Sequence, residues 1–155
     1  MRRPTNNIGY LINHLAFVLG RQSDYALQQA LGIGFSQFKI MMVLKWNPSV
    51  QQKQIADSLG QTEASISRQI KLLHDKGYLT TRISAENRRE HITTLTEKGE
   101  AATTTAMQTL NEYHAPVFAA FSEAQREQLK QLLTTMHAEV CRDRKPGACD
   151  HPLGI

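Results

Sequence analysis

Apolar residues recur at helical spacing along most of this chain of 155 residues. Over residues 8–31 they return every three or four positions, which predicts one long helix that ends at Gly32. A second helix is predicted from a cap at Ser36 up to Asn47-Pro48, because a proline biases the preceding backbone away from the helical region. Each of these helices carries an apolar stripe, so each has a face that must be covered.

Two short helices joined by a tight turn follow. The first is predicted over residues 51–59 and ends at Gly60, a residue suited to the left-handed conformation after a helix. Thr62 can cap the second, which is predicted over residues 63–76 and stops before another glycine. This arrangement is typical of a helix-turn-helix, whose second helix enters the major groove of DNA.

The pattern then changes from that of helices to that of strands. Residues 78–83 and 91–95 are rich in β-branched and aromatic side chains, which predicts two strands, and the polar stretch 84–89 predicts a hairpin tip between them. Two strands are too few for an independent sheet, so the hairpin must rest on helices. The order of elements predicts a mainly α fold with a small two-stranded β wing beside the helix-turn-helix.

Two further helices complete the predicted fold. Thr96 caps the first, over residues 97–120, in which Pro116 predicts a kink or an interruption. Ser122 and Gln125 have the spacing of a capping box and open the last helix. The apolar face of this last helix consists of Leu129, Leu132, Leu133, Met136 and Val140.

Composition narrows the class of protein without naming a function. Hydrophobic residues make up 41% and charged residues 21%, as in ordinary globular domains, and the net charge of +4 permits a polyanionic partner without requiring one. No run approaches the roughly 20 apolar residues that span a bilayer, and no apolar run follows the basic start, so we expect a cytoplasmic protein with no membrane partner. The chain has no phosphate loop, nucleophile elbow or zinc-protease motif, so we predict neither an enzyme nor a bound cofactor.

Polar and cationic residues gather where a helix-turn-helix would meet double-stranded DNA. Arg68 can pair with guanine or contact a phosphate, and Lys71 suits a phosphate. Arg88 and Arg89 stand at the hairpin tip, a position that suits the narrow, electronegative minor groove. The predicted DNA-contact residues are Thr62, Glu63, Ala64, Ser65, Ser67, Arg68, Lys71, Arg88 and Arg89.

Four motifs in this region resemble the MarR (multiple-antibiotic-resistance regulator) family. They are Gln54-Ile55-Ala56-Asp57-Ser58-Leu59-Gly60, Asp75-Lys76-Gly77-Tyr78-Leu79, Asn87-Arg88-Arg89 and Leu95-Thr96-Glu97-Lys98-Gly99. The motifs cover residues 51–99, and the order of helices extends the likeness to about 8–141. The resemblance implies a single domain over 1–155, with a DNA-binding lobe at about 33–99, dimerisation helices at 8–31 and 97–141, and a tail at 142–155. The family usually has aspartate where Asn87 stands, so the brace of this wing is expected to lack a charge.

The same resemblance implies what the protein does. It predicts a sequence-specific transcription regulator, expected to be a repressor, that binds a pseudo-palindromic operator as a homodimer and is released by a small molecule or an oxidative signal. The alternative is a winged-helix module that binds DNA without sequence preference or binds a protein. Such regulators often bind small aromatic or phenolic effectors between the dimer helices and the DNA-binding lobe. Candidate residues for an effector pocket are His14, Phe17, Arg21, Phe38, Met42 and Trp46.

The end of the chain leaves three interpretations open. Its two cysteines, Cys141 and Cys149, do not form a disulfide framework of the secreted kind, and they fit a reducing compartment. With His137 and His151 they offer four nitrogen and sulfur ligands that can hold zinc. The two thiols can instead sense an oxidant, or these residues are incidental at a frayed helix end.

Overall fold

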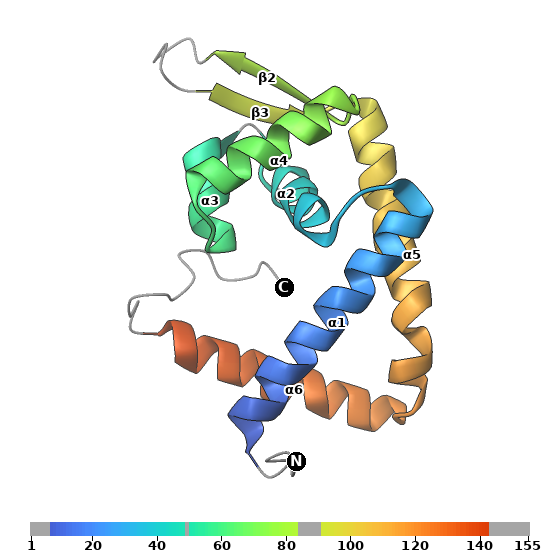
Figure 1. Cartoon of the computed structure of the whole chain (residues 1–155). Coiled ribbons are helices and arrows are strands. Elements are labelled where there is room, and N and C mark those ends of the chain that lie inside the picture. Colours follow the sequence, from blue (N-terminus) through green and yellow to red (C-terminus); the bar gives the residue numbers. More distant parts are fainter. Residues whose placement is uncertain (1–6, 49, 84–90, 143–155) are drawn as a thin grey trace, which may run out of the picture.

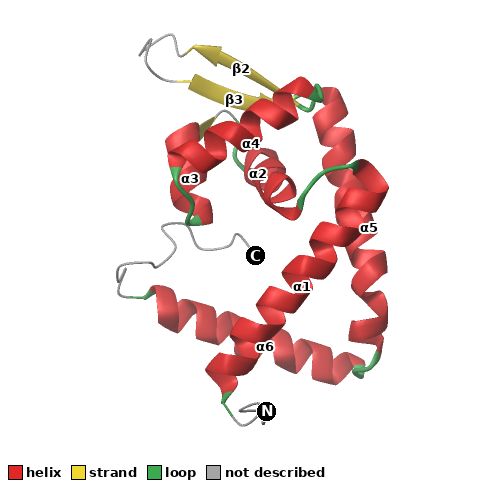
Figure 2. Ribbon diagram, viewed as in Figure 1, coloured by secondary structure: helices red, strands yellow, loops and turns green. Residues whose placement is uncertain are grey.

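The computed structural model describes residues 7–48, 50–83 and 91–142, which form helices around a small sheet. The elements are α1 (Ile8–Leu31), α2 (Phe35–Trp46), β1 (Val50–Gln51), α3 (Gln52–Leu59), α4 (Glu63–Asp75), β2 (Leu79–Ile83), β3 (His91–Leu95), α5 (Glu97–Ala119) and α6 (Glu123–Cys141). Figure 1 shows α2, α3, α4 and the β2–β3 hairpin gathered in one lobe, from which α1 and α5 run to the opposite end, where α6 crosses them. Figure 2 shows that helices dominate the described chain, so the predicted mainly α fold class is confirmed.

The first two helices begin and end where local hydrogen bonds stop them. The side chain of Asn7 caps α1 by accepting from the Tyr10 N–H at 2.8 Å. The predicted cap of α2 at Ser36 is wrong, because the helix begins earlier, after Gly34. The Gln37 side chain accepts from the Gly34 N–H at 3.0 Å and that of Asp24 from the Phe35 N–H at 2.8 Å, so the first amides of α2 are satisfied without a serine cap.

The sheet has one strand more than the predicted hairpin. Its described strands lie in the order β1-β3-β2, and both pairings are antiparallel. In the hairpin Leu79 lies opposite Leu95, while β1 adds Val50 opposite Thr93. Strand β1 was not predicted from the sequence, because two residues are too few to show an alternating pattern.

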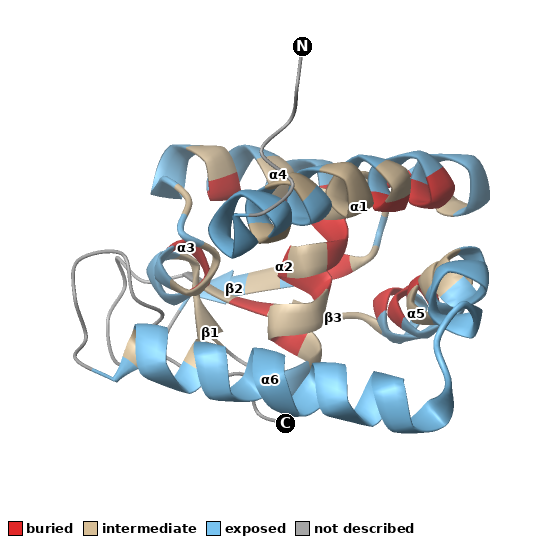
Figure 3. Cartoon of the chain, turned by 90° about the horizontal axis from the view of Figure 1, so that it is seen from below, coloured by how far each residue is buried: buried red, intermediate tan, exposed pale blue. Residues whose placement is uncertain are grey.

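The hydrophobic core lies inside the lobe and extends onto the neighbouring faces of α1 and α5, as Figure 3 shows. Its largest fully buried apolar side chains are Leu27, Ile33, Ile40, Met41, Leu44, Ile55, Ile66 and Leu73. Helix α6 has no buried residue. Burial of apolar area stabilises a fold by about 25 cal/mol per Å², so the lobe is the part of this chain that supports its own folding. Within the residues described, none of the helices is both long enough and apolar enough to span a membrane.

Helix α5 runs without interruption through Pro116, so the predicted interruption is wrong, while the predicted kink stays a prediction. Pro116 and Glu112 are both exposed, so water can satisfy the carbonyl that the proline leaves without a donor. Near its start, threonine hydroxyls donate back to carbonyls four residues earlier, from Thr103 to Gly99 at 2.7 Å and from Thr105 to Ala101 at 3.0 Å. Thr104 and Thr109 do the same. Such bonds let threonine occupy a helix and often bend it.

A buried hydroxyl in the middle strand predicts a stabilising substitution. Thr93 is fully buried, and its Oγ1 has no hydrogen-bond partner among the described residues. Replacing Thr93 with valine should therefore raise the free energy of unfolding by about 1 kcal/mol, because a methyl group needs no partner. Urea denaturation measures the change. The matched control is Thr103→Val, which removes a hydroxyl that is equally buried but bonded, and should be destabilising. A similar loss of stability in both variants would contradict the prediction.

Candidate DNA-binding surface

Helices α3 and α4 are joined by a tight turn that local hydrogen bonds close at both ends. Gly60 follows α3 in the left-handed region, at φ +60°, where a side chain would be strained. The Gln61 N–H donates to the Ala56 carbonyl at 3.0 Å and closes α3. Thr62 then caps α4, its Oγ1 accepting from the Ser65 N–H at 3.2 Å. The two helices and their short turn therefore have the connection of a helix-turn-helix.

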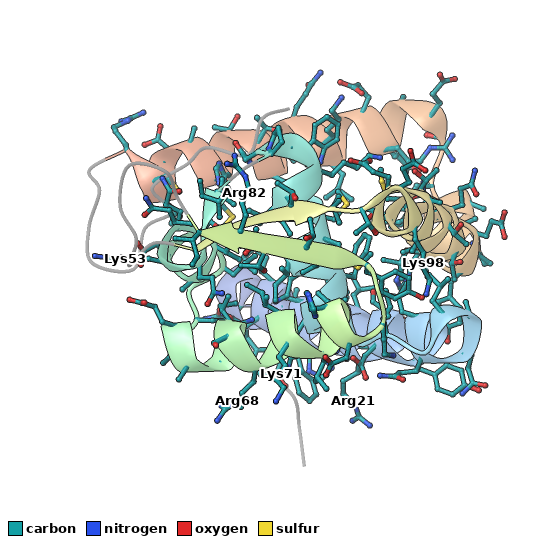
Figure 4. All side chains as sticks on the ribbon, turned by 90° about the horizontal axis from the view of Figure 1, so that it is seen from above. Arg21, Lys53, Arg68, Lys71, Arg82 and Lys98 are labelled. Atoms are coloured by element: carbon teal, nitrogen blue, oxygen red, sulfur yellow. The ribbon has the colours of Figure 1, made fainter. Side chains whose placement is uncertain are left out.

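Helix α4 divides into a buried face and an exposed polar face. Ile66, Ile70 and Leu73 are buried against the lobe. Among the predicted DNA-contact residues, those exposed on α4 are Glu63, Ala64, Ser67, Arg68 and Lys71. Figure 4 shows Arg68 and Lys71 pointing away from the sheet on the outer side of α4.

Two of the predicted contact residues serve the turn itself. Thr62 is the cap of α4. Ser65 is half-buried, and its hydroxyl donates to the side-chain oxygen of Gln61 at 3.4 Å. Both lie at the N-terminal end of α4, which presents backbone N–H groups and a partial positive charge to an anion.

The cations Arg68 and Lys71 on α4 are not paired with acidic side chains of the described residues. In the part of the chain that the structure describes, none of the ion pairs includes Arg68 or Lys71. Glu63 is the acidic residue in the first turn of α4. Arg68 and Lys71 therefore need not break an ion pair in order to meet phosphate or base.

Two further exposed cations lie on elements of the same lobe and were not predicted from the sequence. Lys53 is exposed near the start of α3, and Arg82 is exposed on β2. Figure 4 shows Lys53 at the end of the lobe formed by α3 and Arg82 on the hairpin. The alternation along 79–83, with Leu79 buried and Thr80 exposed, was the available signal for Arg82.

The wing is described up to its tip and no further. Strands β2 and β3 pair from Leu79 opposite Leu95 to Ile83 opposite His91. Arg88, Arg89 and Asn87 lie outside the described residues, so the minor-groove contact and the missing charge in the brace stay predictions.

An open groove of about 620 Å³ lies between α1 and α2. It brings together Phe17 and Arg21 of the predicted effector pocket. The guanidinium of Arg21 lies 5.8 Å from the centre of the Phe17 ring, a cation–π contact. The other residues lining this groove are Ala16, Gly20, Asp24, Tyr25, Gln28, Phe35, Ser36 and Lys39.

The remaining candidates for an effector pocket lie elsewhere. Phe38 is buried in the core, and Met42 packs against it. Trp46 is 68% exposed at the end of α2, and the ring of His14 stacks on that of Tyr10, with 5.8 Å between their centres.

The structure places only part of the candidate thiol and metal site. The Sγ of Cys141 lies 3.7 Å from the Nε2 of His137, one turn earlier on α6. Cys149 and His151 lie outside the described residues. Among the residues that are described, no three or more histidine, cysteine or acidic side chains form a group able to hold a metal ion. The redox and zinc interpretations both stay predictions.

Comparison with known proteins identifies the lobe. The winged helix DNA-binding domain family matches residues 37–114, half of the chain. This match includes α3, α4, the hairpin and most of α5. No curated protein sequence is significantly similar to the chain.

Solved structures of MarR regulators share the whole fold. A MarR/EmrR family transcriptional regulator from Acinetobacter sp. ADP1 is 29% identical, with a TM-score of 0.75 over 93% of this chain and 100% of that one. A MarR transcriptional regulator from Methanosarcina mazei Go1 is 26% identical, with a TM-score of 0.77 over 85% of this chain and 94% of that one.

A third protein of this fold has been solved in two complexes, one with DNA and one with a small molecule. The transcriptional repressor CouR bound to a 23-mer DNA duplex is 22% identical, with a TM-score of 0.75 over 85% of this chain and 93% of that one. CouR from Rhodococcus jostii RHA1 bound to p-coumaroyl-CoA is 17% identical, with a TM-score of 0.72 over 88% of this chain and 95% of that one. At these identities the likeness to CouR concerns the fold alone.

The predicted resemblance is therefore confirmed by both the family match and the shared fold. The exposed polar face of α4, beside the β2–β3 hairpin, is the part of the fold that meets DNA in a winged helix. The family and the fold are those of transcription regulators, which are not enzymes. This chain belongs to the winged helix DNA-binding domain family and is a transcription regulator of the MarR type.

Proposed function

We propose that this protein is a homodimeric repressor that binds a pseudo-palindromic DNA operator and releases it when a small molecule binds. The observation that carries the proposal is the exposed face of α4, where Ser67, Arg68 and Lys71 lie opposite a fully packed face. Small residues near the start of the helix let its axis approach the groove, and the cations further along suit guanine and phosphate. Lys53 near the start of α3 and Arg82 on β2 are further exposed cations of the same lobe (Figure 4).

The dimer is inferred from apolar surface that the single chain leaves uncovered. No residue of α6 is buried, yet one face of this helix is apolar. Leu132 is 61% exposed and Val140 62% exposed, and apolar residues of α1 and of the end of α5 are exposed at the same end of the molecule (Figures 1 and 3). A monomer rarely leaves so large an apolar patch in water, so a second copy is its natural cover. Two recognition helices related by a twofold axis would read half-sites about 34–36 Å apart.

The groove between α1 and α2 is the candidate site for a regulatory ligand. Aromatic rings from both helices line it, and the two cations Arg21 and Lys39 stand beside the rings of Phe17 and Phe35. CouR, which shares this fold, binds a CoA thioester of an aromatic acid. A ligand in the groove would favour one arrangement of α1 relative to the lobe. The protein would leave DNA when the distance between the two recognition helices in that arrangement no longer matches the operator half-sites.

The decisive experiment compares specific with non-specific binding. A duplex is first selected from a randomised library by the wild-type protein, and gel shifts then measure its affinity and that of a scrambled duplex at moderate salt. We expect the selected duplex to be pseudo-palindromic and to bind at least about 10³-fold more tightly than the scrambled duplex. Equal affinity for the two duplexes would contradict sequence-specific regulation and favour a non-specific or protein-binding module.

Replacing Arg68 with alanine should weaken binding to the selected duplex. The expected loss is about 1–3 kcal/mol, with relaxed preference at one base pair in each half-site, because a bidentate contact to guanine is lost. Gel shifts against single-base variants of the duplex measure both effects. Lys130→Ala is the matched control, since it removes an exposed cation from α6, away from the lobe. Equal losses in the two variants would place the recognition surface elsewhere.

A further inference from the structure

The C-terminal end of α4 is fastened by two kinds of hydrogen bond. Gly77 lies in the left-handed region at φ +75°, and the N–H groups of Gly77 and Tyr78 donate to the carbonyls of His74 and Leu73 at 2.8 and 3.0 Å. This pattern is a Schellman motif, which closes the helix locally. Thr96, the cap of α5, also holds this end, because its N–H donates to the Tyr78 carbonyl at 3.0 Å and its hydroxyl to the Gly77 carbonyl at 2.7 Å. The bonds that reach α1 come from a lysine side chain instead.

Two lysines connect three elements in series at this point. The Nζ of Lys98, in the first turn of α5, donates to the Lys76 carbonyl at 2.6 Å and lies 5.0 Å from the centre of the Tyr78 ring. The Nζ of Lys76 in turn donates to the carbonyl of Gly32, the residue that ends α1. Each ammonium group therefore meets the negative end of a helix dipole, which strengthens its hydrogen bond.

The side-chain amine of Lys76 makes a hydrogen bond to backbone, whereas the cations on the outer face of α4 are exposed. Lys76 is half-buried and bonded to backbone, whereas Lys71, one and a half turns earlier, is exposed and outside every ion pair of the described chain. Gly32 has φ +62°, and a Cβ there would lie 3.7 Å from the amine of Lys76. The contact therefore joins the end of α1 to the end of α4 at close range.

We propose that Lys76 is a positioning residue for DNA recognition, which sets the tilt of α4 by holding its end against the end of α1. The proposal rests on the proposed sequence-specific function. Ile66, Ile70 and Leu73 hold α4 in the core along its length, but a packed helix can still pivot unless its ends are fixed. Helix α1 lines the open groove with α2, so a displacement of α1 in that groove reaches α4 through this contact.

The test compares Lys76→Met with Lys71→Met and Lys76→Arg. Methionine keeps an unbranched chain and removes the charge and the donor, while arginine keeps both. The probes are a duplex selected by the wild-type protein from a randomised library and a scrambled duplex of equal length. Affinity is measured over a range of salt concentrations, at temperatures where circular dichroism shows every variant folded.

We expect Lys76→Met to weaken binding to the selected duplex about three- to tenfold, and to leave binding to the scrambled duplex and the salt dependence unchanged. Non-specific binding needs only phosphate contacts, which a small tilt of α4 does not remove. Lys76→Arg should restore most of the affinity. Lys71→Met should instead weaken both duplexes and reduce the slope of log K against log salt by about 1.

Three results would overturn the proposal. Equal weakening on both duplexes with a smaller salt slope would make Lys76 a phosphate contact. A lower melting temperature with unchanged selectivity would make it a purely structural residue, and no change at all would leave it without a role in positioning. Failure of the wild-type protein to select any sequence would contradict the proposed function itself, and is therefore distinguishable from these outcomes.

Discussion

Replacing Gly99 with alanine is expected to unfold the DNA-binding lobe or to displace the wing from it. A Cβ at this position would lie 2.0 Å from the Tyr78 carbonyl oxygen and 3.1 Å from the Leu95 side chain. The Leu95 side chain can shift slightly, but the Tyr78 oxygen belongs to backbone that the Thr96 N–H holds at 3.0 Å. Overpacking of this kind costs about 1–3 kcal/mol when side chains can give way, and more when backbone must move. We expect a loss of about 3–5 kcal/mol, a large share of the stability of a small domain.

Chemical denaturation followed by circular dichroism measures this loss, with Gly20→Ala as the matched control. Gly20 is also a helical glycine, but a Cβ there would lie 3.9 Å from the Phe35 ring, which is ordinary contact. Alanine is a better helix former than glycine, so Gly20→Ala should be neutral or stabilising by up to about 1 kcal/mol. If Gly99→Ala were tolerated as well as Gly20→Ala, the close approach of α5 to the base of the wing would be refuted.

Replacing Leu132 with glutamate should separate the proposed dimer and abolish tight operator binding. Leu132 lies on the exposed apolar face of α6, and a carboxylate buried there against a second copy would be desolvated without a partner. We expect the dimer dissociation constant to rise by at least about 100-fold. A monomer reads one half-site, so affinity for the palindromic duplex should fall by several orders of magnitude through lost avidity.

Sedimentation velocity reports the oligomeric state, and Ala138→Glu is the control. Ala138 is exposed on the side of α6 opposite the apolar face, so this substitution adds the same charge without entering that face. The hydrophobic core of the lobe contains no residue of α6, so circular dichroism should show the lobe folded in both variants. A Leu132→Glu protein that remained dimeric and bound DNA as before would show that α6 is not the interface.

The helices of this fold could be predicted from sequence because their signals are local. Periodic apolar residues and the glycines at 32, 60 and 77 gave the bounds of α1, α3 and α4 to within a residue or so. The cap of α2 could not be predicted in the same way, since Asp24 satisfies the Phe35 amide from eleven residues earlier. Strand β1 was missed because pairing with β3, rather than any pattern of its own, makes it a strand.

In the candidate site, too, the features set by local sequence could be predicted and those set by distant contacts could not. The outer face of α4 follows from helical periodicity, so Arg68 and Lys71 were predictable as exposed cations. The contact of Lys76 with Gly32 joins residues 44 positions apart, and no local signal announces it. The effector groove shows the same limit: only Phe17 and Arg21 of the six predicted residues line it, because side chains on one helix face different neighbours.

The threonine-rich start of α5 places hydroxyl groups of a kind that often bends a helix between the lobe and α6. Its 23 residues span about 34 Å at 1.5 Å per residue. A bend of about 6° over that length moves one end by about 3.4 Å, the rise of one base pair. In the proposed dimer each lobe is joined to α6 through its own α5. The displacements of the two lobes therefore add. We therefore expect the preferred spacer between operator half-sites to depend on these hydroxyl groups, and changing Thr104 or Thr105 to valine should alter that spacing.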